Sequence, residues 1–193
     1  MEFGTVLDKM KLILALFISF AAGCTSLLVE EPIGSDFTPE QLSDFEGSWL
    51  ISNKGDISQI IDLKKIDNIG TFKTASIEWN DDEKAFDLDE GKVILKKGNK
   101  YGILHIMDDE FQKSERKYLL ITLFKTREDH KIESWLPSNK SIKEFLSSGA
   151  LKTENVDGDI VITDKPQRII DELESNFQLI FDQESSVILT KIK

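Results

Sequence analysis

Alternation of apolar and polar residues dominates the middle of the chain. Ala75, Ile77 and Trp79 alternate with polar neighbours, a period of two that is typical of a strand with one buried face. Asn, Gly and Asp residues separate such segments at short, even intervals, which indicates an antiparallel meander. The segments expected as strands are 48–52, 57–66, 71–79, 92–97, 101–107, 117–126 and 131–136.

Helical patterns flank this region. Thr38, Pro39 and Gln41 give an N-cap, a proline at the first helical position and a capping-box partner, so a short helix is expected before Gly47. In the last third, Ser141 is expected to cap a second helix. The apolar stripe of that helix is Ile142, Phe145 and Leu146.

The C-terminal segment completes the expected fold. Asp164 is expected to cap a helix whose apolar face is Ile169, Ile170, Leu173 and Phe177. Strands are expected at 160–163, after the turn Asp157-Gly158-Asp159, and at 186–192. The sequence therefore predicts an α+β fold: a curved antiparallel β-meander or incomplete barrel with two short C-terminal helices.

The N-terminus has the pattern of an export signal. Lys9 and Lys11 precede an apolar run over residues 12–23, and small residues lead into Cys24. Twelve apolar residues are too few for a transmembrane helix, which needs about 20. Residues 1–23 are therefore predicted to be a signal peptide. Two acids in the first eight residues are unusual for the charged start of a signal, so the start is either Met1 or Met10, and Met10 would make 1–9 a spurious extension.

The end of this segment resembles the lipobox of bacterial lipoproteins. The resemblance implies cleavage before Cys24 and a lipid on its thiol, although Ala21 stands where that family more often has leucine. Thr25, in place of an aspartate, implies transport to the outer membrane, facing the periplasm, in a Gram-negative cell. Residues 24–37 are then expected to form a lipidated tether, and 38–193 a single β-rich domain. The alternatives are a signal followed by a chance cysteine in a core, or a core helix of a soluble protein.

The charge limits the classes of partner to expect, and the cysteine content limits the cross-links. The chain carries 24 Lys and Arg against 35 Asp and Glu, a formal net charge of -11, so binding to nucleic acid is not expected. The same charge disfavours docking on an anionic membrane without a hydrophobic anchor. With one cysteine, no internal disulfide is expected.

Residues 45–49, Phe-Glu-Gly-Ser-Trp, resemble the Gly-x-Trp opening of lipocalin-type barrels. The resemblance implies that Trp49 plugs the floor of a barrel at its first strand. The later Thr-Asp-x-x-Tyr turn of that family is missing, and helices interrupt the final strands. The order of elements also resembles small uncharacterised bacterial lipoproteins, a family that supplies no activity.

Residues for catalysis or metal binding are scarce. The histidines are interpreted as a half-buried strand residue, His105, and a solvated turn residue, His130. The acidic segments 80–83 and 87–91 lack the spacing of a calcium loop and are expected to be solvated loops between strands. No cofactor, metal site or catalytic residue is predicted.

Trp49, Trp79, Phe124 and Trp135 fall in expected strands and could line a shared interior. They form either a plain core or a pocket for an apolar ligand. The leading hypothesis is a non-enzymatic, membrane-anchored envelope lipoprotein that binds a protein partner or an apolar ligand. Two alternatives stay open. One is a carboxylate-based hydrolase of envelope sugars. The other is an inhibitor or immunity-type lipoprotein in which a protruding acidic loop such as 80–91, with Asp81 and Asp82, plugs a basic enzyme site.

Overall fold

The computed structural model describes residues 27–53, 56–80, 84–107, 118–137, 139–156 and 159–192. The signal segment and Cys24 lie outside the described residues, so their roles stay predictions.

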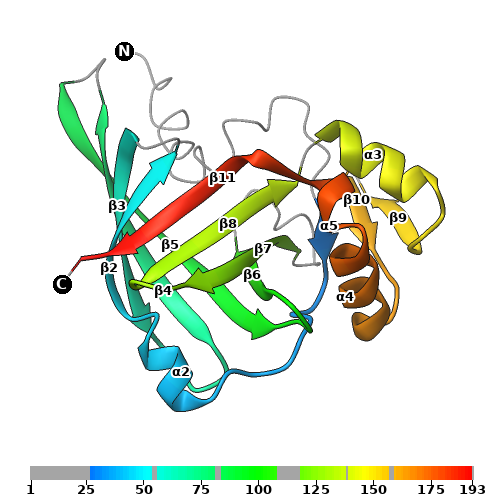
Figure 1. Cartoon of the computed structure of the whole chain (residues 1–193), viewed down its shortest axis with the longest axis horizontal. Coiled ribbons are helices and arrows are strands. Elements are labelled where there is room, and N and C mark those ends of the chain that lie inside the picture. Colours follow the sequence, from blue (N-terminus) through cyan, green and yellow to red (C-terminus); the bar gives the residue numbers. More distant parts are fainter. Residues whose placement is uncertain are drawn as a thin grey trace, which may run out of the picture.

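Eight antiparallel strands form a closed barrel (Figure 1). Seven of them follow the chain and the eighth, β11, returns between β8 and β2. Because β6 also pairs with β7, every strand of the ring has two neighbours and no edge is left open. The strands are β2 (Gly47–Asn53), β3 (Asp56–Lys65), β4 (Thr71–Asn80), β5 (Ala85–Lys97), β6 (Gly102–Met107), β7 (Leu119–Arg127), β8 (Lys131–Pro137) and β11 (Phe181–Lys191).

This architecture confirms the predicted antiparallel meander and barrel, with two corrections. The barrel is closed, not incomplete, since β11 pairs with both β8 and β2. The fold is mainly β, because the helices are short and contribute little of the architecture.

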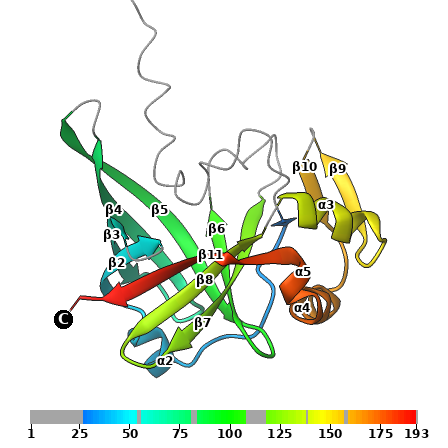
Figure 2. The same cartoon turned by 45° about the horizontal axis from the view of Figure 1, so that its top comes forward.

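A small annex lies against one side of the barrel (Figures 1 and 2). Leu28 in β1 (Leu28–Val29) pairs with Leu120 of β7 and with Val161 of β10 (Asp159–Ile162). An additional strand, β9 (Thr153–Val156), pairs with β10 and was not predicted. The helices on this side are α3 (Asn139–Ser147), α4 (Pro166–Ser175) and α5 (Phe177–Ile180).

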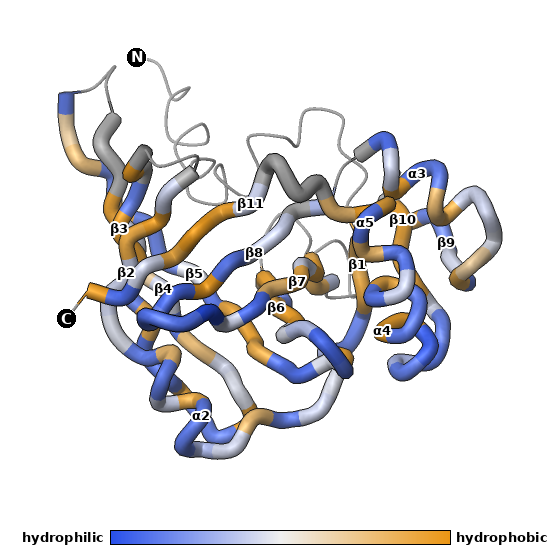
Figure 3. The backbone as a smooth tube through the Cα atoms, viewed as in Figure 1, coloured by the Kyte–Doolittle hydropathy of each residue, from blue (hydrophilic) through white to orange (hydrophobic). Residues whose placement is uncertain are grey.

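The annex explains why β7 begins with an unbroken run of buried residues. Thr122 and Phe124 face the barrel interior, whereas Ile121 and Leu123 belong to an outer cluster that includes Trp135 and Ile169. A strand covered on both faces loses the alternation of apolar and polar residues that marks a half-buried strand. Alternation persists in β4 (Figure 3), but in the reverse orientation from the expected one: Thr74 and Ser76 are buried, whereas Ile77 is exposed.

The floor of the barrel is closed by α2 (Pro39–Ser43). Thr38 caps this helix through the predicted capping box with Gln41, which confirms that prediction. Leu42, Phe45 and Trp49 are buried in the interior cluster together with Phe72 and Phe124. Short α2 thus sits where its apolar residues meet the inward side chains of the first strands.

Residues 27–37 belong to the segment predicted as a tether. In the structure Leu27, Leu28 and Val29 are fully buried, and Ile33 lies in the outer cluster. Leu27, only three residues after Cys24, is therefore already packed against the rest of the protein.

The prediction of a solvated loop at 87–91 is wrong. These residues lie within β5, where Asp89 pairs with Ser76 and Gly91 pairs with Thr74 of β4. Pairing along a long hairpin outweighs the low strand propensity of acidic residues.

Two predicted helix starts are also wrong. Lys165, not Asp164, is the N-cap of α4, and Pro166 takes the first helical position. Asp164 instead accepts hydrogen bonds from the backbone N–H groups of Lys165 and Lys152. Similarly α3 begins at Asn139, so Ser141 lies inside that helix, although the predicted stripe of Ile142, Phe145 and Leu146 is buried.

Candidate site in an outer groove

The four aromatic residues predicted to line a pocket do not all meet. Trp49 and Phe124 lie in the interior cluster of the barrel. Trp135 faces outward and belongs to the outer cluster. Trp79 pairs with Phe86 through the backbone, and its side chain lies outside the described part of the structure.

The interior is densely packed at its floor. The rings of Phe37, Phe45, Phe72 and Phe124 contact one another with centroid distances of 5.3 to 6.5 Å. The indole N–H of Trp49 donates to the carbonyl oxygen of Phe45 over 3.0 Å. These contacts make the floor a core.

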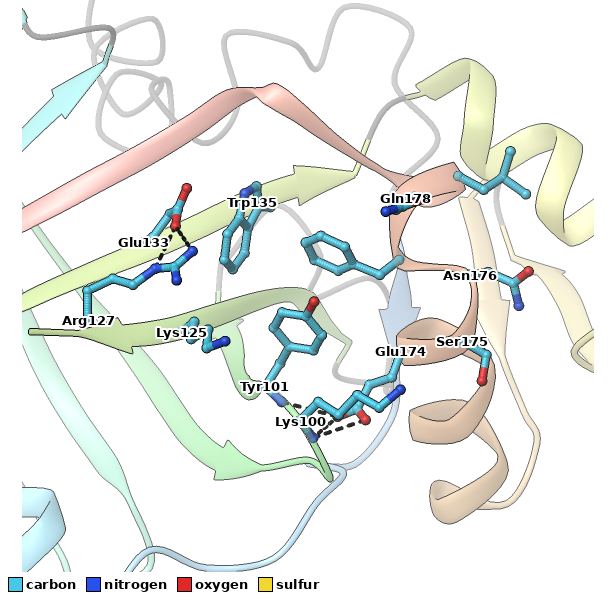
Figure 4. A pocket seen from close by; sticks show the side chains of 12 residues that line it. Lys100, Tyr101, Lys125, Arg127, Glu133, Trp135, Glu174, Ser175, Asn176 and Gln178 are labelled. Atoms are coloured by element: carbon cyan, nitrogen blue, oxygen red, sulfur yellow. Dashed lines mark hydrogen bonds and ion pairs between the residues drawn. The ribbon is translucent and has the colours of Figure 1, made fainter.

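A groove of about 630 Å³ lies on the outside of the barrel, between β7–β8 and the α4–α5 junction (Figure 4). We call it the outer groove. Its lining comes from three regions distant in sequence: Lys100 and Tyr101 before β6, Lys125, Arg127, Glu133 and Trp135 on β7 and β8, and residues 174–179.

Three aromatic rings form the base of the outer groove. Tyr101 stacks on Phe177 with a centroid distance of 4.5 Å, and Trp135 meets both rings edge-on at 5.8 and 5.1 Å. Offset stacking and edge-to-face packing are the favourable arrangements of aromatic pairs. The three rings therefore pack together as one aromatic cluster.

Glu174 fixes the turn that presents Lys100. Its Oε1 accepts hydrogen bonds from the backbone N–H groups of Asn99, Lys100 and Tyr101 at 2.8, 2.9 and 3.3 Å. The turn approaches so closely that a Cβ on Gly98 would lie 2.4 Å from the same oxygen. One buried carboxylate thus ties α4 to the β5–β6 turn.

The cationic groups of the outer groove differ in how they are paired. Arg127 donates through Nε to Oε2 of Glu133 over 2.9 Å, which neutralises that arginine within the chain. Lys100 and Lys125 have no carboxylate partner among the described residues. Within the described part of the chain, these two lysines are the cations of the outer groove without an intramolecular counter-ion.

His105 is fully buried and serves the fold. It lies on the outer face of β6, where Nε2 accepts from the backbone N–H of Ile33 at 3.0 Å and Nδ1 lies 3.1 Å from the carbonyl oxygen of Ile94. This arrangement requires a neutral ring protonated at Nδ1. Burial lowers the pKa of His105 to about 4. The predicted half-buried position was wrong because β1 and the following segment cover it. His130 is exposed in the β7–β8 turn, as predicted.

Other chemistry has little support in the described residues. No group of three or more His, Cys, Asp or Glu residues could hold a metal ion there. Hydrogen bonding to the backbone N–H of Lys165 lowers the pKa of Asp164, the opposite direction from a catalytic acid. Asp81 and Asp82 lie outside the described residues, so the inhibitor interpretation stays a prediction. No helix within the described ranges is long and apolar enough to cross a bilayer.

The sequence did not predict the outer groove. Tyr101 and Phe177 each stood in an expected strand or helix, but nothing in the pattern showed that they would meet Trp135. Comparison with known protein families, with curated proteins and with solved structures finds no match for this chain. Its function must therefore be inferred from the geometry of the site.

Proposed function

We propose that this chain is a lipid-anchored envelope lipoprotein whose barrel domain binds a protein partner through the outer groove, without catalysis. The observation that carries this proposal is the pair Lys100 and Lys125. These cations lack ionic partners among the described residues and flank an aromatic base, in a protein of net charge -11.

The chemistry of the outer groove matches a segment that carries a carboxylate beside an apolar side chain. Lys100 and Lys125 supply the positive charge (Figure 4). Leu179, which is 48% exposed, supplies an apolar rim, and Asn176 and Gln178 offer amide groups for hydrogen bonds to a peptide backbone. Charged and amide groups around an exposed apolar side chain match the anatomy of a protein–protein site.

A protein partner fits this site better than an enclosed apolar ligand. The rings of Tyr101, Trp135 and Phe177 pack together at 4.5 to 5.8 Å, and Trp135 and Phe177 are buried, so they offer little surface to an enclosed ligand. The floor of the barrel is filled in the same way by its phenylalanines.

Lipidation of Cys24 would hold the domain close to the bilayer. Only residues 25 and 26 separate Cys24 from Leu27, which is fully buried. Three residue steps reach at most about 10 Å when extended. A domain held at this height is positioned to meet membrane-bound or periplasmic partners near the surface.

Site-specific photo-crosslinking in living cells tests the proposal. A photoreactive residue at Gln178, on the rim of the outer groove, should give one defined protein adduct with the full-length, membrane-extracted chain. Reversal of both lysines in Lys100→Glu/Lys125→Glu should reduce that adduct about tenfold, because two attractive contacts become repulsive.

A matched control uses lysines outside the outer groove. Lys140→Glu/Lys143→Glu makes the same change of charge on α3, where both side chains are exposed, and should leave the adduct unchanged. Equal loss in both double variants would show a general charge effect and would count against a specific groove. Absence of any adduct from Gln178 would contradict the proposed function.

A further inference from the structure

The outer face of β3, β4 and β5 carries an apolar patch. Ile60 pairs with Ile77, and Ile77 pairs with Leu88, so three apolar side chains form a row across adjacent strands. Phe86 and Ile57 extend the row toward the ends of their strands. The five side chains are 42 to 70% exposed, whereas their inward neighbours Gln59 and Ser76 are buried.

Charged rows follow the apolar patch along the same face. Asp62, Ala75 and Glu90 form the next outward row, and Lys64, Lys73 and Lys92 form the row after it. A fourth row, with Ile66, Thr71 and Ile94, lies beyond the lysines. Along the strands the face therefore reads apolar, acidic, basic and again largely apolar.

This order is self-complementary. Consider a two-fold axis that lies in the plane of the face, perpendicular to the strands, between the acidic and basic rows. The second copy then stacks on the face so that each strand lies opposite the same strand of the first copy and runs in the reverse direction. Asp62 then faces Lys64 of the second copy. Glu90, which pairs with Lys73 of its own chain at 2.7 Å, faces Lys92 of the second copy. The same rotation places Ile60 opposite Ile66 and Leu88 opposite Ile94. A symmetric dimer requires this reciprocity.

We propose that the outer face of β3–β5 is a dimer interface between two copies of this chain. The apolar patch alone exposes on the order of 500 Å², since side chains of this size contribute roughly 100 Å² each at half exposure. With the charged rows the face approaches the roughly 800 Å² per partner of a specific interface. The outer groove lies on β7, β8 and α4–α5, so this proposal is independent of the proposed function.

A lipid bilayer fits the outer face of β3–β5 less well than a second copy of the chain does. Asp62 and Glu90 lie two residues along their strands from Ile60 and Leu88, a spacing of about 7 Å. Insertion of the patch would bring these exposed carboxylates to the hydrocarbon boundary, where charge is costly.

Native mass spectrometry of the full-length protein, released from mild detergent, tests the dimer. The wild type should be dimeric at about 10 µM, and Ile77→Asp should shift it to monomer. Leu179→Asp puts the same charge on a similarly exposed residue outside the interface and should leave the dimer intact.

A charge swap separates interface effects from folding effects. Asp62→Lys places a lysine opposite Lys64 of the second copy and should weaken the dimer at least tenfold, whereas Asp62→Lys/Lys64→Asp should restore it. A monomeric wild type would overturn the proposal, even if it bound vesicles of phosphatidylethanolamine and phosphatidylglycerol. A dimer that Ile77→Asp and Asp62→Lys both leave unchanged would overturn it equally.

Discussion

Oε1 of Glu174 lies 2.9 Å from the backbone nitrogen of Lys100, so a carboxylate on α4 holds the turn that presents a lysine to the outer groove. The same oxygen also accepts from Asn99 and Tyr101. The shape of the site therefore depends on a side chain that has little exposure of its own.

Removing this carboxylate should destabilise the fold. Glu174→Ala leaves three N–H groups without their acceptor and is expected to lower the free energy of unfolding by about 2–4 kcal/mol. Glu174→Gln keeps an acceptor oxygen but loses the charge, so its loss should be smaller. Urea unfolding measures both. Glu144→Gln, at an exposed position of α3, is the control and should change stability by less than about 0.5 kcal/mol.

His105 should make the protein less stable in mild acid. Burial lowers its folded pKa from 6.5 to about 4, although the hydrogen bond with Ile94 acts the other way. Between these pH values the unfolded chain binds a proton that the folded chain does not, so stability falls as the pH falls from about 6.5 to about 4. Below about pH 4 His105 is protonated in both the folded and the unfolded chain, so its contribution to the free energy of unfolding stops changing. The full effect is about 3 kcal/mol.

Urea unfolding from pH 4 to 8 measures this dependence. A variant of His105 separates its contribution to stability from that of the carboxylates. His105→Gln keeps a side chain that can accept from Ile33 but cannot gain charge in this range, so its stability curve should be flatter. His130→Asn changes an exposed histidine and should follow the wild type. If the free energy of unfolding of His105→Gln changes with pH in parallel with that of the wild type, His105 is not the titrating group.

Gly102 should not tolerate a side chain. It pairs with Phe124 inside the barrel, and a Cβ at this position would lie 2.1 Å from Cζ of that ring. Gly102→Ala is expected to cost about 1–3 kcal/mol, because a packed aromatic must move. Adding Phe124→Leu should recover part of the loss, and a double-mutant cycle by urea unfolding measures the coupling. Strictly additive effects would contradict the close approach.

Lys191 should contribute to the floor of the barrel. Its ammonium group lies 5.5 Å from the ring centroid of Trp49 and donates to the carbonyl oxygen of Asp44 over 2.8 Å. Lys191→Met should lower the free energy of unfolding by about 1 kcal/mol, since it removes both contacts. Lys191→Arg preserves the charge and should lose less. Thermal unfolding compares the two, and equal losses would show that the charge is not what matters.

Local patterns predicted the elements of the fold better than their arrangement. Thr38 and Gln41 form their capping box within one turn of helix, so sequence alone was sufficient. Closure of the barrel depends on pairs such as Leu189 with Ile51, which lie more than 130 residues apart. The local pattern predicts a loop for acidic residues such as Asp89, because pairing with β4 is what places them in β5.

For a related reason, the pattern of apolar and polar residues does not predict the outer groove. Alternation assigns Trp135 to one face of its strand but does not tell which face is inside. Its neighbours Tyr101 and Phe177 come from a turn and a helix that the annex brings together. Lys100 and Lys125, which lack a carboxylate partner among the described residues, stood out only when their surroundings were known.

Native mass spectrometry of the full-length protein, extracted from its own membranes in mild detergent, tests both the lipid anchor and the binding of a protein partner. We expect a chain that begins at a lipid-modified Cys24 and retains a protein partner, which Lys100→Glu/Lys125→Glu releases. An unmodified Cys24 in an uncleaved chain, or an apolar small molecule in place of the partner, would contradict this expectation.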